Sequence, residues 1–197
     1  MIFFVVMFCA FSCAPKKPPI ERNHYILELS RAQTESLVMI PASLSVRDFS
    51  VSPGYQGKEL IYKVGKGKAV SDFYNHFFIL PGPMIAQLTR SWIKQAGLFQ
   101  SVIPMSSRKN ADYILEGAVS RVYADFQDRT NPSAVLKINF LLLKDTGFDY
   151  EIAFQREYIS RTSMTDPSAG SMVGALNNCL SDILQSLEDD LLEAFQR

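Results

Sequence analysis

The sequence predicts an α+β fold: a single domain whose mainly antiparallel β-sheet is packed by a central helix and by a long C-terminal amphipathic helix. Three long runs in the second half of the chain alternate apolar and polar residues with a period of two, which is typical of a sheet with one solvated face. The chain then ends in apolar residues spaced by three and four, as in an amphipathic helix. A chain of 197 residues, 47% of them hydrophobic, can bury the core of one domain.

The first segment is an apolar run from Ile2 to Phe11 that ends in Ser12-Cys13-Ala14. The run is too short for a transmembrane helix, which needs roughly twenty apolar residues, but it suits the core of a signal peptide. Its end resembles the cleavage box of bacterial lipoproteins. We therefore predict a lipoprotein signal peptide over residues 1–12, and acylation of Cys13 by chains such as palmitate. A signal peptide without lipidation and a short buried segment remain the alternatives.

Residues 13–23 are expected to tether the lipidated cysteine to the folded domain, which then covers residues 24–197. The segment from Ala14 to Asn23, APKKPPIERN, is rich in proline and charge and cannot form a packed element. At about 3 Å per residue, an extended segment of this length reaches about 30 Å. The domain is therefore expected to lie just off a membrane surface.

The first half of the domain is expected to consist of short strands separated by turns. The four apolar runs are His24–Leu29, Ser43–Val51, Glu59–Val64 and Ala69–Phe78. The alternation is broken within the second run. Pro53-Gly54 and the glycines around Lys66 mark the chain reversals on either side of the third run.

A central helix is expected to begin at Pro81-Gly82-Pro83 and to end before Gly97, which suits a left-handed C-cap. Its apolar positions recur close to the helical period: Ile85, Leu88, Trp92 and Ile93. A short strand, Gln100–Pro104, and three long strands, Ala111–Phe126, Ser133–Lys144 and Tyr150–Ser163, are expected to follow. In the last strand Tyr150, Ile152, Phe154 and Tyr158 are expected to share the apolar face.

The C-terminal helix is expected from about Ser168 to Phe195, after a cap and a helix-starting proline at Asp166-Pro167. We expect it to lie across one face of the sheet, although the same spacing also suits a coiled coil between protomers. Cys179 falls on its apolar side and is expected to pack in the core. The acidic triplet Glu188-Asp189-Asp190 is expected to be a solvated face.

Known catalytic patterns are missing from the sequence. The 20 basic and 20 acidic residues balance, so the charge gives no reason to expect a nucleic-acid partner. The glycines near Lys58 and Lys66 lack the spacing of a nucleotide-binding loop, and Ser171 lies in GSMVG instead of G-x-S-x-G. The two histidines, His24 and His76, belong to no Cys or His cluster. We therefore expect no catalytic residue, metal or cofactor.

Aromatic residues concentrate between residues 55 and 78. Aromatic side chains serve both cores and partner interfaces. A core role is the simpler expectation for any one of them, but together, around glycine-rich turns, they suit an exposed docking edge. The candidate docking residues are Tyr55, Gln56, Tyr62, Tyr74 and Phe77.

The segment from Val46 to Val102 resembles the ABC-type transport auxiliary lipoproteins. It has a strand, the turn Tyr55-Gln56, a hydrophobic strand with Tyr62, an aromatic segment, a proline-led helix and Gly97-Leu98-Phe99 in the order typical of that family. The strand at Ala111–Gly117 and the C-terminal helix extend the resemblance. It implies a non-enzymatic periplasmic subunit that works with an ABC transporter permease and ATPase and with MCE-domain proteins, which move lipids between the inner and outer membranes. Ala14 follows the lipidated cysteine, which by resemblance to a known sorting rule favours the outer membrane.

Two other hypotheses on the function of the protein remain open. An outer-membrane assembly or envelope-integrity adaptor would carry the same anchor, with a β-barrel or peptidoglycan-associated partner. A lipid-modifying enzyme would depend on Ser171 or His76. Both the C-terminal helix and the aromatic edge are compatible with a homo-oligomer.

Overall fold

The computed structural model describes residues 21–31, 39–104 and 106–196 of the chain. Cys13, the signal peptide and the tether up to residue 20 lie outside these ranges. The strands are β1 (Asn23–Tyr25), β2 (Ile40–Val46), β3 (Ser50–Val51), β4 (Glu59–Gly65), β5 (Lys68–Phe77), β6 (Phe99–Ile103), β7 (Tyr113–Asp125), β8 (Ser133–Asp145) and β9 (Tyr150–Ser163). The helices are the 3₁₀ turn η1 (Pro53–Tyr55), α1 (Pro81–Ala96) and α2 (Ala169–Gln196). These elements confirm the predicted α+β class.

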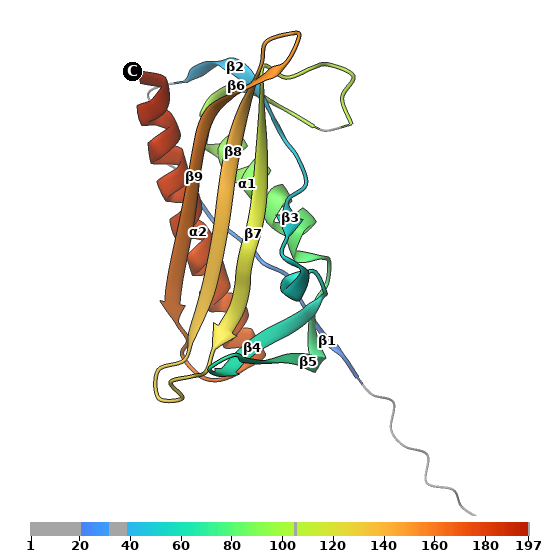
Figure 1. Ribbon diagram of the computed structural model, residues 1–197, viewed down its shortest axis with the longest axis vertical. Helices are drawn as coiled ribbons and strands as arrows, with labels where there is room; N and C mark the ends of the chain where they lie inside the picture. Colours follow the sequence, from blue (N-terminus) through green and yellow to red (C-terminus); the bar gives the residue numbers. More distant parts are fainter. Residues whose placement is uncertain (1–20, 32–38, 105, 197) are drawn as a thin grey trace, which may run out of the picture.

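Strand β7 organises the sheet (Figure 1). One of its edges pairs antiparallel with β8 along its whole length, and β8 pairs in the same way with β9. Its other edge pairs in parallel with three short strands in turn: β2, then β3, then β4. The sheet continues from β2 to β6 at one end of β7, and from β4 through β5 to β1 at the other. The sheet is thus mixed: the long strands pair antiparallel with one another, and the short strands pair mostly in parallel.

The run expected as one strand over Ser43–Val51 forms two strands, because the chain turns inward between them. There the buried Phe49 places its ring 5.6 Å from that of Phe140 and covers the backbone of Gly117. The broken alternation seen in the sequence reflects this turn.

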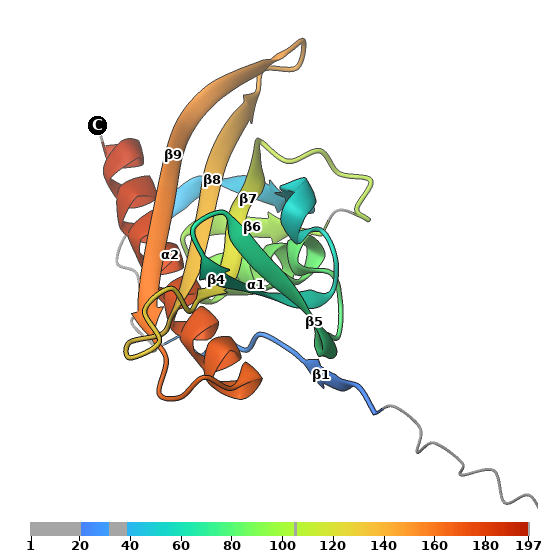
Figure 2. The ribbon, with the colours of Figure 1, turned by 60° about the horizontal axis from the view of Figure 1, so that its bottom comes forward.

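Both helices cover one face of the sheet and contact each other (Figure 2). Helix α2 lies along β8 and β9, and α1 lies against β2, β3 and β6. Gly97 ends α1 in a left-handed conformation with a φ of 64°, as predicted. The Ser168 hydroxyl accepts a hydrogen bond from the Ser171 N–H (3.1 Å), so Ser168 caps α2, two residues after the expected cap Asp166. Cys179 is fully buried, which confirms its core position.

The acidic triplet of α2 is not the solvated face that we expected. The Glu188 side chain is buried between the two helices, where it pairs with Arg31 (2.7 Å) and accepts a hydrogen bond from the Trp92 indole (2.9 Å). Asp190 binds Arg156 and the Tyr158 hydroxyl, and only Asp189 is exposed. Helical periodicity predicted that these three acidic residues lie on the C-terminal helix, but it could not show which of their side chains faces α1.

The segment expected as a strand over His24–Leu29 is a strand only as far as Tyr25. Beyond it the Leu27 N–H donates to the Met84 sulfur (3.5 Å) and the Glu28 N–H donates to the Asn177 side chain (3.1 Å). These donors therefore bond to the helices and not to the sheet.

The far end of the β8–β9 hairpin extends beyond the rest of the sheet (Figure 2). Tyr150 and Ile152 are 47% and 63% exposed there, so the apolar face predicted for β9 holds only further along, at Phe154 and Tyr158. The register also shifts between Leu142 and Leu143. Phe148, at the tip, is fully exposed.

Candidate docking site at the β4–β5 end

The five predicted docking residues lie in three environments. Tyr55 stacks on Tyr123 of β7, with 6.0 Å between ring centroids, and Gln56 donates a hydrogen bond to the Val51 carbonyl of β3 (2.9 Å), so both residues help to hold η1 against the sheet. Phe77 is only 2% exposed and belongs to the core, so the docking role expected for it is not supported. Tyr62 and Tyr74 are brought together through one carboxylate, that of Asp72.

Asp72 holds an irregular bulge at the β5 end. Its Oδ1 atom accepts hydrogen bonds from the Tyr74 N–H (2.8 Å) and the Asn75 N–H (3.0 Å). Its Oδ2 atom accepts hydrogen bonds from the Tyr62 hydroxyl (2.7 Å) and the Asn75 amide (2.8 Å). The register of β4 against β5 shifts across this stretch, between Ile61 and Glu59. The carboxylate therefore replaces ladder partners for the backbone, as is common at bulges.

The bulge displays an aromatic face, defined here as Phe73, Tyr74 and Phe78. These side chains are 52%, 55% and 56% exposed. The Phe73 and Tyr74 rings meet edge to face at 5.3 Å, and the Arg22 guanidinium lies 5.0 Å from the Phe73 ring centre. Tyr74 and Phe78 are exposed, whereas the three residues between them are half-buried or buried, and the Phe78 ring lies 6.1 Å from that of His24.

An apolar groove of about 950 Å³ opens between the β4–β5 hairpin and the start of α2. Its apolar lining is Tyr25, Tyr62, Val64, Val70, Phe126 and Ala169, and its polar groups include Asp72, Asn75 and Arg129. The volume and the mainly apolar lining are within the range of ligand pockets, about 300–1,000 Å³. The Tyr62 ring packs against Phe126 at 5.4 Å, so this residue forms a wall of the groove as well as a donor to Asp72.

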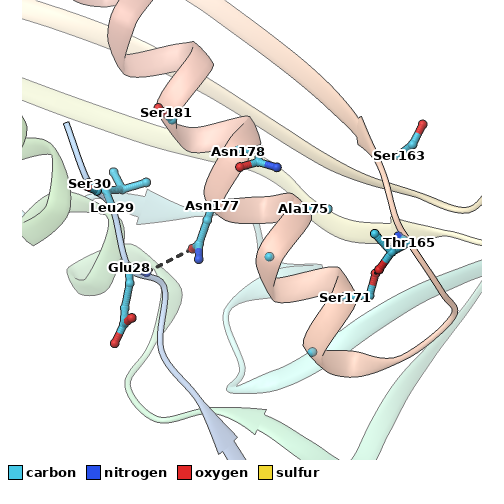
Figure 3. A pocket seen from close by; sticks show the side chains of 12 residues that line it. Glu28, Leu29, Ser30, Ser163, Thr165, Ser171, Ala175, Asn177, Asn178 and Ser181 are labelled. Carbon is cyan, nitrogen blue, oxygen red and sulfur yellow. Dashed lines mark hydrogen bonds between the residues drawn. The ribbon is translucent and has the colours of Figure 1, made fainter. Parts of the chain in front are cut away.

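A polar groove of about 650 Å³ runs along the other side of the start of α2 (Figure 3). The Ser171 hydroxyl there accepts hydrogen bonds from the Thr165 N–H (2.9 Å) and the Asp166 N–H (3.3 Å), so it fixes the turn before the helix. Across the groove, Asn177 binds the backbone of Glu28. This arrangement gives Ser171 a structural role.

The parts of the chain that the structure describes lack two kinds of feature. No group of three or more His, Cys, Asp or Glu side chains there is placed to hold a metal ion. None of the helices in those parts has the length and apolar character needed to cross a membrane.

Because the bulge is held by the ionised Asp72 carboxylate, the stability of the fold is expected to depend on pH in acid. Partial burial alone would raise the pKa of Asp72, but the hydrogen bonds from Asn75, Tyr62 and the backbone outweigh it and hold that pKa below its usual value. The lowered pKa stabilises the fold above the unfolded-state pKa of about 3.9, and this stabilisation is lost as the pH falls through the folded-state pKa. We expect Asp72→Asn to lower the melting temperature at about pH 7 and the difference from wild type to narrow below about pH 4. Thermal unfolding of both proteins across this pH range measures the two melting temperatures. A difference between them that stays constant with pH would contradict the prediction.

Sequence reasoning missed Asp72, Asn75 and Arg22. Aspartate is depleted in strands, so Asp72 within a predicted strand was the available signal for a bulge. Nothing in the sequence showed that Tyr62, ten residues earlier, would reach it.

Fold and site together define a single-domain α+β protein with an apolar groove and an exposed aromatic face at one end. No protein-family model matches the chain, and no curated protein matches it either. Among solved structures, protein XCC0632 from Xanthomonas campestris, described with the family DUF330, has this fold, with a TM-score of 0.77 at 15% identity over 88% of this chain and 97% of that one.

Two other structures are similar. One, described as an uncharacterized protein, has a TM-score of 0.68 at 13% identity and covers 87% of this chain and 99% of its own. Hypothetical protein CT253 from Chlamydia trachomatis has a TM-score of 0.52 at 8% identity and covers 77% and 98%. None of these names describes an enzyme. At such identities the likeness establishes the fold, and the function is a separate question.

Proposed function

We propose that this chain is a non-enzymatic, lipid-anchored envelope protein that serves as an auxiliary subunit of an ABC/MCE-type transport system moving lipids between the inner and outer membranes. The cleavage box at Cys13, the resemblance over Val46–Val102 and the fold shared with a DUF330 protein support this proposal. Ala14 supports retention at the outer membrane.

The observation that carries the proposal is the position of the apolar groove. Tyr25, at the end of β1, lines the groove, and β1 is the first strand after the tether. A lipid anchor at Cys13 would therefore hold the groove close to the bilayer, where a subunit of a lipid transport system has to meet its partners. A partner segment with apolar side chains would fill the groove, and Arg129 at its edge would select for acceptors such as carboxylates.

The anchor is tested by Cys13→Ala. We expect this variant to leave the membrane fraction and appear in the soluble periplasmic fraction, because two or more acyl chains are required for stable anchoring. The domain should keep its melting temperature, since residue 13 lies outside it. Retention of the variant in the membrane fraction would contradict the anchor.

The partner is tested by crosslinking and affinity purification of the tagged protein. We expect the wild type to recover an MCE-domain protein and Val70→Asp, which places a charge in the groove, to lose it. The matched control is Ile159→Asp, a change at an exposed β-branched residue of β9 outside the groove. Recovery of a β-barrel assembly or peptidoglycan-associated protein instead would favour the envelope-adaptor function.

A further inference from the structure

We propose that the aromatic face, Phe73, Tyr74 and Phe78, contacts the lipid bilayer directly, so that the domain lies with its β5 end against the membrane that holds Cys13. This inference rests on the lipid anchor of the proposed function. It goes further, because an anchored domain could equally stand clear of the surface at the end of its tether.

The aromatic face is a built feature of the fold. Four hydrogen bonds to one carboxylate hold the bulge that carries Phe73 and Tyr74 outward. Each aromatic ring left in water forgoes the stabilisation that burial would give, about 25 cal/mol for each Å² of apolar surface. A sequence that fixes such rings in the exposed position with specific hydrogen bonds favours a surface that is covered in the working protein.

The chemistry of the face suits a bilayer interface. Phenylalanine supplies apolar surface, and the tyrosine hydroxyl can stay among the headgroups while its ring enters the acyl boundary. Arg22 lies over Phe73, and the Lys58 ammonium donates a hydrogen bond to the Phe78 carbonyl (2.8 Å), so both cations stand beside the rings. Lys16 and Lys17 precede them in the sequence. These four cations exceed the acids Glu21, Glu59 and Asp72 by one charge, which suits anionic headgroups.

The length of the tether selects this face over the other exposed aromatic group of the molecule. Arg22 is nine positions after Cys13, so at about 3.3–3.6 Å per residue it lies at most about 30 Å from an anchored cysteine, and Phe73 lies directly beside Arg22. The turn between β8 and β9 lies at the opposite end of the sheet from β4 and β5 (Figure 1), beyond the 13 residues of β8, which span about 44 Å. This turn contains Phe148 and leads into Tyr150. A bilayer that reaches Phe73 does not reach Phe148 in the same orientation.

The test uses the lipidated protein reconstituted in vesicles of phosphatidylethanolamine and phosphatidylglycerol. Phe73→Trp should show a blue-shifted emission and be quenched by brominated lipids. Phe148→Trp, the matched control at the opposite end, should behave as in water. The buried Trp92 is common to both variants and gives the background. An unquenched tryptophan at position 73, or equal quenching at both positions, overturns the inference.

A second measurement tests bilayer contact in a chain that has no lipid anchor. Chains from residue 13 onward with Cys13→Ser are sedimented with the same vesicles, and we expect the double variant Phe73→Ser/Tyr74→Ser to bind about tenfold more weakly than the parent. Phe148→Ser/Tyr150→Ser removes the same two residue types and should bind like the parent. No binding by the parent, equal loss in both variants, or crosslinking of position 73 to a protein instead of lipid in cells would each contradict bilayer contact. For Cys13→Ala, the membranes are washed with carbonate before fractionation, which removes protein held only by surface contact. That fractionation then reports on the anchor separately, so the two proposals can fail independently.

Discussion

Replacing Glu188 with alanine is expected to lower the free energy of unfolding by about 3–5 kcal/mol, the usual result of removing one partner of a buried ion pair. The side chains of Glu188 and Arg31 are each 6% exposed, and the same carboxylate accepts the Trp92 indole N–H. The Arg31 guanidinium also lies 5.9 Å from the Trp92 ring centre. Alanine at position 188 would leave a buried cation and a buried indole N–H without this acceptor.

Urea unfolding followed by circular dichroism measures this effect. The control is Asp189→Ala, which removes an exposed carboxylate one residue further along the same helix and should change the stability by less than about 0.5 kcal/mol. Glu188→Gln keeps an acceptor for Trp92 and should fall between the two. Equal stabilities for the position 188 and position 189 alanine variants would show that the cluster contributes nothing.

Phe49→Ala is expected to cost about 3–5 kcal/mol, because it opens a cavity where the ring packs on Phe140. The same ring covers Gly117, where an added Cβ would lie 2.6 Å from three ring carbons. Gly117→Ala should therefore cost about 1–3 kcal/mol by overpacking. In the double variant the new methyl group occupies space that the ring has left, so the combined loss should be smaller than the sum of the two.

The control for the glycine is Gly174→Ala. This position lies inside α2 with no heavy atom within 4 Å of an added Cβ. Alanine there should stabilise the protein by up to about 1 kcal/mol, because glycine is a poor helix former. Strictly additive losses for Phe49→Ala and Gly117→Ala in denaturant titrations would mean that the ring does not limit the space at Gly117.

Local patterns in the sequence predicted most elements because each depends on neighbouring residues. The helix at Pro81–Ala96 has its proline start and glycine end, and the three long strands have their alternation. The partners of the short strands could not be predicted in this way. Pairing of β2, β3 and β4 with β7 joins residues more than 60 positions apart, and no local period encodes such a choice.

The candidate site was predicted only in outline. Aromatic enrichment located the region, but a count of aromatic residues does not separate the buried Phe77 from the exposed Tyr74 three positions earlier. Tyr74 lies in the bulge that Asp72 holds, whereas Phe77 lies after it, where its N–H donates to the Lys58 carbonyl (2.6 Å) and its side chain packs in the core. Glu188 was misread for a similar reason, since its burial depends on Arg31 and Trp92, which come from two distant segments.

Three short strands pair with one edge of β7, so the sheet can be completed only after β7 has been synthesised. β2, β3 and β4 all precede β7 in the sequence. Although β2 can pair with β6 and β4 with β5 earlier, none of the three can join β7 until residues 113–125 are available. Loop closure over such separations is slow compared with local helix formation. Until β7 is made, the separate pieces of the sheet in the first half of the chain therefore stay unconnected, and a chain that completes its fold late can still be threaded through a membrane before it folds.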